Sequence, residues 1–260
     1  MIHTITRMLF LFALVFSLTA QDLVQQDPEP NRFPSLIGVE YEGPVNLSPV
    51  VTSTKAKPVR NEAVYSVGDT PPDLANFYWV NQGACVANTN PDGSVTLFHP
   101  GAAGLGWNTC MIVTPLPAPP YTVISGFTGH ILGKAASLAE VLLESSNGKY
   151  IMYSTGSSDT GVAALAAWRM NSPTLYQAPP VFSYSTAMAT GGLLPQYYRT
   201  KRSGGFRTRA ISNGRGVWLT ISVTSDTDHV TGDYIGFASR GTGDNLASLM
   251  TIFHHSITTP

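Results

Sequence analysis

The sequence feature that most constrains the fold is a series of short runs, rich in β-branched and aromatic residues, that recur from Leu74 onwards with turn residues between them. Among them are Tyr121–Ile131, Lys149–Thr155 and Gly216–Thr224. No run of twelve or more residues has helical periodicity with caps, and only Lys134–Leu143 has a composition that favours a helix. Many strands at close spacing predict an all-β, two-sheet antiparallel sandwich of the jelly-roll kind.

The composition agrees with this fold class. Charged residues make up 12% of the chain, about half of the usual share of roughly 25%. A hydrophobic content of 43% together with so little charge excludes the disordered class. The net charge of −1 gives no field that draws the protein to nucleic acid, so no nucleic-acid partner is expected.

Three segments are predicted along the chain. Residues 1–20 have Arg7 and the ten-residue apolar run Leu9–Leu18, which as a helix rises about 15 Å, roughly half a bilayer. This favours a signal peptide and an exported, extracellular or virion-surface protein, with a retained hydrophobic segment or a mis-assigned start codon as alternatives. Residues 21–73 carry eight prolines, which predict an extended arm that pads the domain or contacts a virion or homo-oligomeric neighbour. Residues 74–260 are the sandwich.

The segment Ser145–Lys149 contains Asn-Gly, the preferred two-residue hairpin turn, which would place Glu140 opposite Thr155. Alternation then separates two faces. We expect one face to belong to the core, and it is made of Val141, Leu143, Tyr150 and Met152. The other face is expected to be half-exposed or to face a ligand, and it is made of Glu140, Leu142, Glu144, Ile151 and Tyr153.

Alternation in the run Gly216–Thr224 also predicts two sides. The core side is made of Val217, Leu219, Ile221 and Val223, and the opposite side of Trp218, Thr220 and Ser222. Trp79 and Trp218 are assigned to packing between the sheets.

Two cysteines are present, Cys85 and Cys110. In an exported protein they predict a disulfide that closes a loop of about 25 residues and contributes about 3 kcal/mol. In a reducing cytoplasm both would be small buried side chains instead. Neither lies in a CxxC motif and no histidine cluster accompanies them, so zinc is not indicated.

Five motifs occur in a fixed order: Asn76–Gly83, Pro119–Thr122, Ser145–Tyr150, Gly216–Leu219 and Tyr234–Phe237. The ordered set, over about residues 72–258, resembles phage and environmental sequences with a concanavalin A-like sandwich. That resemblance implies the laminin-G, pentraxin and legume-lectin architecture and, in phages, a tail-fibre or virion-surface protein that binds host glycans. The chain departs from the pattern in its signal-like N-terminus and its cysteine in the first motif, which favour a secreted lectin-like protein.

Catalytic patterns are not found. Glu140 and Glu144 lie about 13 Å apart on a strand, too far for a retaining glycosidase pair, and are expected to be solvated. There is no G-x-S-x-G elbow. His254 and His255 point to opposite faces of a strand and are expected at the surface. No cofactor is predicted, although the turn that holds Asp226, Asp228 and Asp233 has oxygen ligands that calcium could use, the alternative being that these acids stabilise the turn itself.

Glycan binding needs exposed aromatic faces beside polar groups. The candidates are Trp168, Tyr153, Tyr176, Tyr197, Tyr198, Arg169 and Arg199, together with Trp107. Trp168 lies among alanines and is the first residue to substitute. A basic cluster is interpreted as a solvated hairpin edge, with a phosphate or acidic-glycan site as the alternative; it comprises Arg199, Lys201, Arg202, Arg207, Arg209 and Arg215.

The sequence therefore predicts a non-catalytic carbohydrate-binding module of a phage or virion surface or tail protein, whose partner is a cell-surface glycan. Two alternatives stay open. One is a secreted bacterial lectin-like adhesion domain, and the other is a polysaccharide-cleaving hydrolase or lyase.

Overall fold

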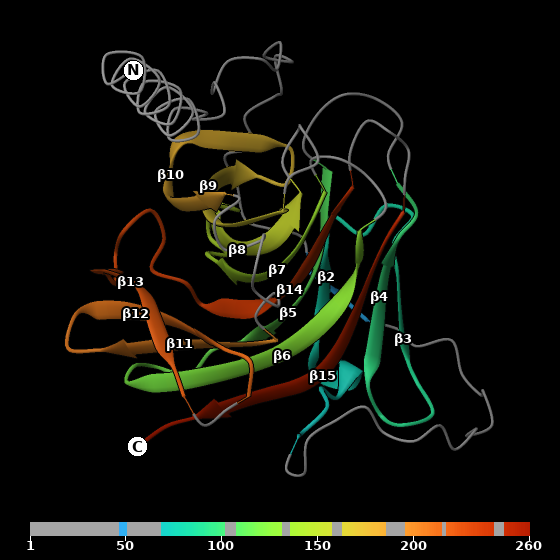
Figure 1. Cartoon of the computed structure of the whole chain (residues 1–260), viewed down its shortest axis with the longest axis horizontal. Coiled ribbons are helices and arrows are strands. Elements are labelled where there is room, and N and C mark those ends of the chain that lie inside the picture. The colour runs from blue at the N-terminus through green and yellow to red at the C-terminus, as the bar shows by residue number, and fades with distance from the viewer. Residues whose placement is uncertain are drawn as a thin grey trace, which may run out of the picture. The chain divides into compact units, whose positions relative to one another are not determined.

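Two antiparallel sheets make up the part of the chain that the structure, a computed structural model, describes: residues 47–50, 69–101, 108–131, 136–157, 163–185, 196–214, 217–241 and 247–260 (Figure 1). The eight-stranded sheet has the order β1 (Ser48–Pro49), β2 (Tyr78–Val80), β5 (Asn108–Pro115), β14 (Tyr234–Gly241), β7 (Ser137–Leu143), β8 (Tyr150–Ser157), β9 (Ala163–Ser172) and β10 (Leu175–Ser185). The seven-stranded sheet has the order β13 (Leu219–Ser225), β12 (Phe206–Ser212), β11 (Tyr197–Ser203), β6 (Tyr121–Ile131), β15 (Ser248–Thr258), β4 (Val95–His99) and β3 (Val86–Thr89). The predicted all-β, two-sheet jelly-roll sandwich is confirmed.

Helix is confined, within the described residues, to one 3₁₀ turn, η1 (Leu74–Asn76), where the Asp73 carboxylate accepts a hydrogen bond from the Ala75 N–H (3.0 Å). The stretch with the most helix-favouring composition, Lys134–Leu143, contains β7 instead, and all seven residues of that strand are buried. Burial of both faces overrides a weak helix propensity, as is common for a central strand.

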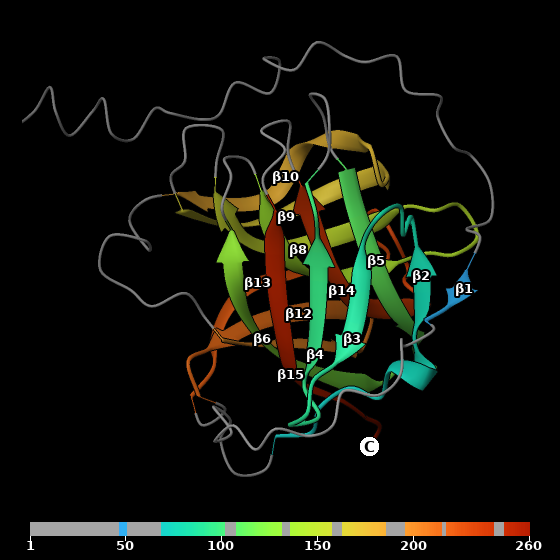
Figure 2. The same ribbon diagram turned by 90° about the vertical axis from the view of Figure 1, so that its right-hand side faces the viewer.

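Side chains of both sheets fill the space between them. Figure 2 looks onto β15, β4 and β3, with strands of the eight-stranded sheet behind them. Trp79 is 4% exposed and belongs to the cluster between the sheets, which confirms its predicted packing role. The buried cluster includes Trp79, Ile112, Leu138 and Phe237 from one sheet and Val95, Leu97, Phe127, Tyr198, Met250 and Ile252 from the other.

The β7–β8 hairpin closes with a four-residue loop, so the predicted two-residue turn is wrong. Glu144 and Lys149 flank this loop, and the Glu144 N–H donates to the Lys149 carbonyl (2.9 Å). Asn147 lacks the positive φ that a two-residue turn would require. Glu140 therefore lies opposite Tyr153, two residues from the predicted partner. Because the shift is an even number of residues, the side chains keep their predicted faces.

Both faces of this hairpin are buried. The predicted core face is confirmed, since Val141, Leu143, Tyr150 and Met152 are all 0% exposed. The prediction of a half-exposed or ligand-facing second face is wrong for its strand residues, which are at most 4% exposed. This second face is directed toward the seven-stranded sheet.

A buried ion pair crosses from one sheet to the other. Arg209 Nη1 of β12 contacts Glu140 Oε1 of β7, and their side chains are 1% and 0% exposed. Thr200 donates to the same Glu140 oxygen (2.7 Å). The Arg209 guanidinium also lies over the rings of Tyr153 and Tyr198, at 4.4 and 4.8 Å from their centroids. The expectation of a solvated Glu140 is therefore wrong, because its face is turned inward and an arginine supplies the neutralising charge.

β13 is an edge strand of the seven-stranded sheet, and its predicted core side is largely exposed. Val217, Leu219 and Val223 are 83%, 61% and 60% exposed. Trp218 is half-buried outside the core cluster, with the Arg199 guanidinium 4.7 Å from its ring centroid. Strict alternation does not hold along the whole strand, because the register with β12 shifts where Arg209 pairs with Ser222 and Ala210 with Thr220. Nor could alternation show that the strand lies at an edge with little packed against it.

The predicted disulfide is present. Cys85 and Cys110 are bonded with a Cα–Cα distance of 6.5 Å and are 4% and 1% exposed. Cys85 directly precedes β3 and Cys110 lies in β5, so this bond joins the two sheets covalently.

Two short pieces of the predicted arm are described. Ser48 and Pro49 pair with β2 as an edge strand. Thr70 bridges to β15, where its N–H donates to His254 Nδ1 (2.9 Å) and its carbonyl accepts from the His255 N–H (2.8 Å). The remaining arm and the predicted signal segment lie outside the described residues, and the division into three segments stays a prediction. No helix in the described part of the chain has the length and apolarity needed to cross a membrane.

We predict that Gly236→Ala destabilises the fold by about 1–3 kcal/mol, the usual range for an overpacked core. A Cβ at this position in β14 would lie 1.9 Å from the Ile112 carbonyl oxygen. Gly214→Ala is the matched control, because no atom lies within 4 Å of its Cβ position. Urea unfolding of both variants gives the comparison, and equal midpoints would contradict the packing described here.

Candidate functional site

The aromatic candidates that meet in space are Trp168 on β9 and Tyr176 on β10. Both are half-buried, and their ring centroids lie 5.2 Å apart at an interplanar angle of 80°. The Trp168 Nε1–H donates to Ser154 Oγ (3.1 Å), which fixes the orientation of the indole. The pair packs beside the buried cluster on the face of the eight-stranded sheet that is turned away from the other sheet. This places two oriented, partly accessible rings at one end of that sheet.

The other aromatic candidates are core residues. Tyr153, Tyr197 and Tyr198 are 4%, 2% and 0% exposed. Tyr198 stacks on Phe127 with centroids 4.6 Å apart, and the Tyr197 hydroxyl donates to the Asp69 carboxylate (3.1 Å). Their faces are covered by protein, so the structure does not bring them to a ligand-accessible surface. Trp107 lies outside the described residues.

The two arginine candidates lie away from the aromatic pair. Arg169 follows Trp168 directly, and alternation therefore places it on the opposite face of β9. There its Nη2 contacts both carboxylate oxygens of Asp228 at 3.0 Å. Arg199 lies on β11 in the other sheet, over Trp218. Neither arginine supplies a polar group beside Trp168.

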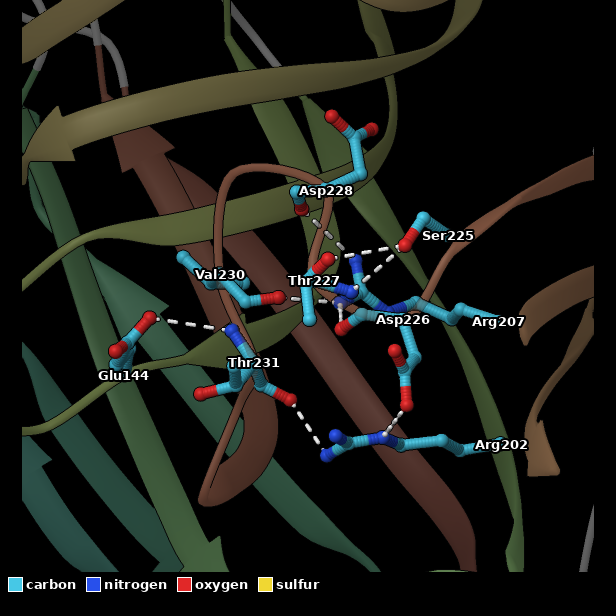
Figure 3. A network of polar contacts seen from close by, with 9 residues as sticks. All are labelled: Glu144, Arg202, Arg207, Ser225, Asp226, Thr227, Asp228, Val230 and Thr231. Carbon is cyan, nitrogen blue, oxygen red and sulfur yellow. Dashed lines mark hydrogen bonds and ion pairs between the residues drawn. The ribbon is translucent and has the colours of Figure 1, made fainter. Parts of the chain in front are cut away.

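Arginines hold the loop between β13 and β14, as Figure 3 shows. Arg207 Nη2 donates to the carbonyls of Asp226 (2.7 Å) and Val230 (2.5 Å). Arg202 Nη1 donates to the Thr231 carbonyl (2.7 Å), while the Thr231 N–H donates to the Glu144 carboxylate (3.1 Å). Carbonyl oxygens of this kind can coordinate a metal cation, but in this loop they accept hydrogen bonds from guanidinium groups.

The solvated-edge interpretation of the basic cluster is wrong for Arg207 and Arg209, each 1% exposed. Their spacing of two residues on one strand places both on the inward face of β12. Lys201 is exposed, as expected of the outward face of β11. Arg215 lies outside the described residues. Two arginines at i and i+2, in a chain of low overall charge, were the signal in the sequence that could have revealed this inward row.

The three calcium candidates do not converge. Asp226 contacts Arg202 Nε (3.1 Å) and Asp228 contacts Arg169. Asp233 accepts from the Ser145 N–H (2.8 Å) and from its hydroxyl. In Figure 3 the carboxylates of Asp226 and Asp228 point to opposite sides of the loop. These acids therefore stabilise the turn and its neighbours, which is the alternative that the sequence left open.

The two adjacent histidines of β15, His254 and His255, pack within the fold. His254 is 2% exposed, so its predicted surface location is wrong. His255 is half-buried, and burial lowers the pKa of its imidazole to about 4. His255 packs against both Phe77 and Phe237, with ring centroids 5.5 and 5.4 Å away. Because β15 continues across the middle of the seven-stranded sheet, its late residues are covered although they lie close to the chain's end.

No protein-family model matches the sequence, and no curated protein matches it. Among solved structures, the xylan β-1,4-xylosidase from Bacillus halodurans is similar over 80% of this chain and 41% of its own, at 9% identity and a TM-score of 0.53. This chain thus spans about two fifths of that enzyme, and the likeness shows the fold alone.

Two other solved structures are also similar to this chain. A legume lectin-like domain from Entamoeba histolytica is similar over 76% of this chain and 99% of its own, at 12% identity and a TM-score of 0.47. The CBM2 module of the evolved Dit of Lactobacillus casei BL23 phage J-1 is similar over 85% of this chain and 99% of its own, at 11% identity and a TM-score of 0.42.

We predict that Arg207→Met costs about 3 kcal/mol or more of stability, because buried carbonyls lose charged donors. Amide exchange at Thr231 should also accelerate as the loop loosens. Lys201→Met is the matched control on the neighbouring strand and should change stability by no more than about 0.5 kcal/mol. Chemical denaturation and hydrogen exchange measure both effects. Equal stabilities for the two variants would show that the loop does not depend on Arg207.

Proposed function

We propose that this chain is a non-catalytic carbohydrate-binding module that holds a glycan against Trp168 and Tyr176. A sugar ring presents apolar C–H faces and hydroxyl edges, and it binds to an aromatic face whose orientation is already fixed. The observation that carries the proposal is the perpendicular packing of these two half-buried rings, with the indole N–H held by Ser154.

The positions of the acids support a binding role over catalysis. A glycosidase needs two carboxyl groups about 5 to 9.5 Å apart on either side of the scissile bond. Glu140 is 0% exposed and paired with Arg209, so a substrate does not reach it. Glu144 accepts from the Thr231 N–H and Asp226 pairs with Arg202. The acids named by the sequence thus have structural partners.

For the setting, we propose the surface of a virion, where the module would recognise a host-cell glycan. The ordered sequence motifs support this setting. The disulfide favours a location outside a reducing cytoplasm, which a virion surface and a secreted lectin-like domain share. Neighbouring genes for baseplate or capsid proteins would distinguish the two.

The test is a glycan array with the full chain, followed by titration of the best ligand. Trp168→Ala should weaken binding at least tenfold, a loss of about 1.4 kcal/mol or more, because it removes the larger ring of the pair. Tyr176→Ala should weaken it as well.

Trp218→Ala is the matched control, since it removes a half-buried tryptophan of the other sheet and should leave affinity unchanged. Near-ultraviolet circular dichroism checks that each variant is folded. Folded Trp168→Ala protein that binds with unaltered affinity would remove this site from the account.

A further inference from the structure

A histidine lies beside the disulfide. Donor atoms of Cys85, His99 and Cys110 all lie within 4.8 Å of one another, and the three residues are 4%, 2% and 1% exposed. In the described part of the chain this is the one group of three or more potential metal ligands that meets such a distance limit. His99 comes from β4, a strand that the spacing of the cysteines gave no reason to connect with them.

The backbone holds each member in place. The Cys85 N–H donates to the Gln82 carbonyl (2.9 Å), and β5 pairs with β14 throughout the strand that contains Cys110. The His99 ring occupies a slot opposite Gly241, where a Cβ would lie 2.3 Å from His99 Cε1. The glycine therefore leaves room for the imidazole against the cysteines.

We propose that reduction of the Cys85–Cys110 bond converts this cluster into a Zn²⁺ site with Cys85, His99 and Cys110 as ligands. A phosphine or dithiol reductant supplies two electrons, the S–S bond breaks, and two protons from water complete the thiols. Binding of Zn²⁺ then releases both protons to solvent, leaving two thiolates and a neutral imidazole on the metal. A water molecule takes the fourth position.

The geometry needs only small movements. With Zn–S of about 2.3 Å and Zn–N of about 2.0 Å, a tetrahedral site places its donor atoms about 3.5 to 3.8 Å apart. The sulfurs separate to that distance once their bond is broken, and the histidine, now within 4.8 Å, moves by roughly 1 Å. The donor set of two thiolates and one imidazole is one that zinc prefers.

Backbone groups hold the His99 ring beside the two cysteines. Nδ1 accepts from the Gly101 N–H (3.0 Å), and the ring also hydrogen-bonds to the backbone of Asn108. Metal binding replaces one of these contacts, and the other remains to orient the ring.

The consequence concerns the link between the sheets. Cys85 lies at the start of the seven-stranded sheet's edge strand and Cys110 in the eight-stranded sheet. When the two cysteines are oxidised, a covalent bond joins the two sheets. When they are reduced, a metal ion joins the sheets instead. The same three residues would then connect the sheets in a reducing cytoplasm and in an oxidising exterior.

The test titrates Co²⁺, a spectroscopic substitute for Zn²⁺, into the full chain reduced with a phosphine under argon. One Co²⁺ per chain should bind, with a thiolate charge-transfer band and the visible bands of tetrahedral cobalt, and Zn²⁺ should displace it. Oxidised protein should show no such bands. His99→Gln should weaken Co²⁺ binding roughly tenfold or more. The control is His130→Gln, which replaces an exposed histidine of β6 and should leave Co²⁺ binding unchanged.

Thermal unfolding provides the second readout. Zn²⁺ should raise the melting temperature of the reduced chain and leave that of the oxidised chain unchanged. Three results would each overturn the proposal: a reduced, folded chain that takes up no Co²⁺; a His99→Gln variant that binds as tightly as the parent; or a reduced chain that unfolds and is not restored by Zn²⁺.

Discussion

The interaction on which the rest of this structure depends is the buried contact between Glu140 and Arg209. Apolar packing, one disulfide and a buried hydrogen bond between the hydroxyls of Ser239 and Ser248 (2.5 Å) also join the two sheets. A carboxylate and a guanidinium that are both removed from water require each other, since either one alone would be a buried unpaired charge. The rings of Tyr153 and Tyr198 also pack against the guanidinium, so a shift of one sheet over the other would expose or separate charges.

The same use of arginine explains how the β13–β14 loop is held. Arg202 and Arg207 extend the inward row and bind carbonyls of the loop, while Arg169 approaches Asp228 from the other sheet. Residues that the sequence presents as possible metal ligands, catalytic acids or a basic binding patch thus act as internal connections. The polar groups described here largely hold the sandwich together, and the proposed glycan site depends on the Trp168–Tyr176 pair instead.

Much of the fold could be predicted because strand alternation is a local property. The two-sheet class, the disulfide and the two faces of the β7–β8 hairpin all follow from residue types and spacing. Alternation cannot tell which face turns inward, however, so Glu140 and Arg209 were expected in water. Nor does it distinguish an edge strand from a central one, as the exposed Leu219 shows. The sequence identified Trp168 and Tyr176 as two candidates close together in the chain, but it did not show that their rings touch. The proximity of His99 to the cysteines depends on tertiary structure alone.

The most direct test of this account is a comparison of unfolding free energies at positions 140 and 209. Glu140→Gln leaves the Arg209 charge buried without its partner and should cost about 3–5 kcal/mol, whereas the double variant Glu140→Leu with Arg209→Met should recover most of that loss. This recovery is the signature of two charges that need each other between the sheets. If Glu140→Gln is as stable as the parent, or if the double variant is the least stable of the three, the pair does not have the role assigned to it.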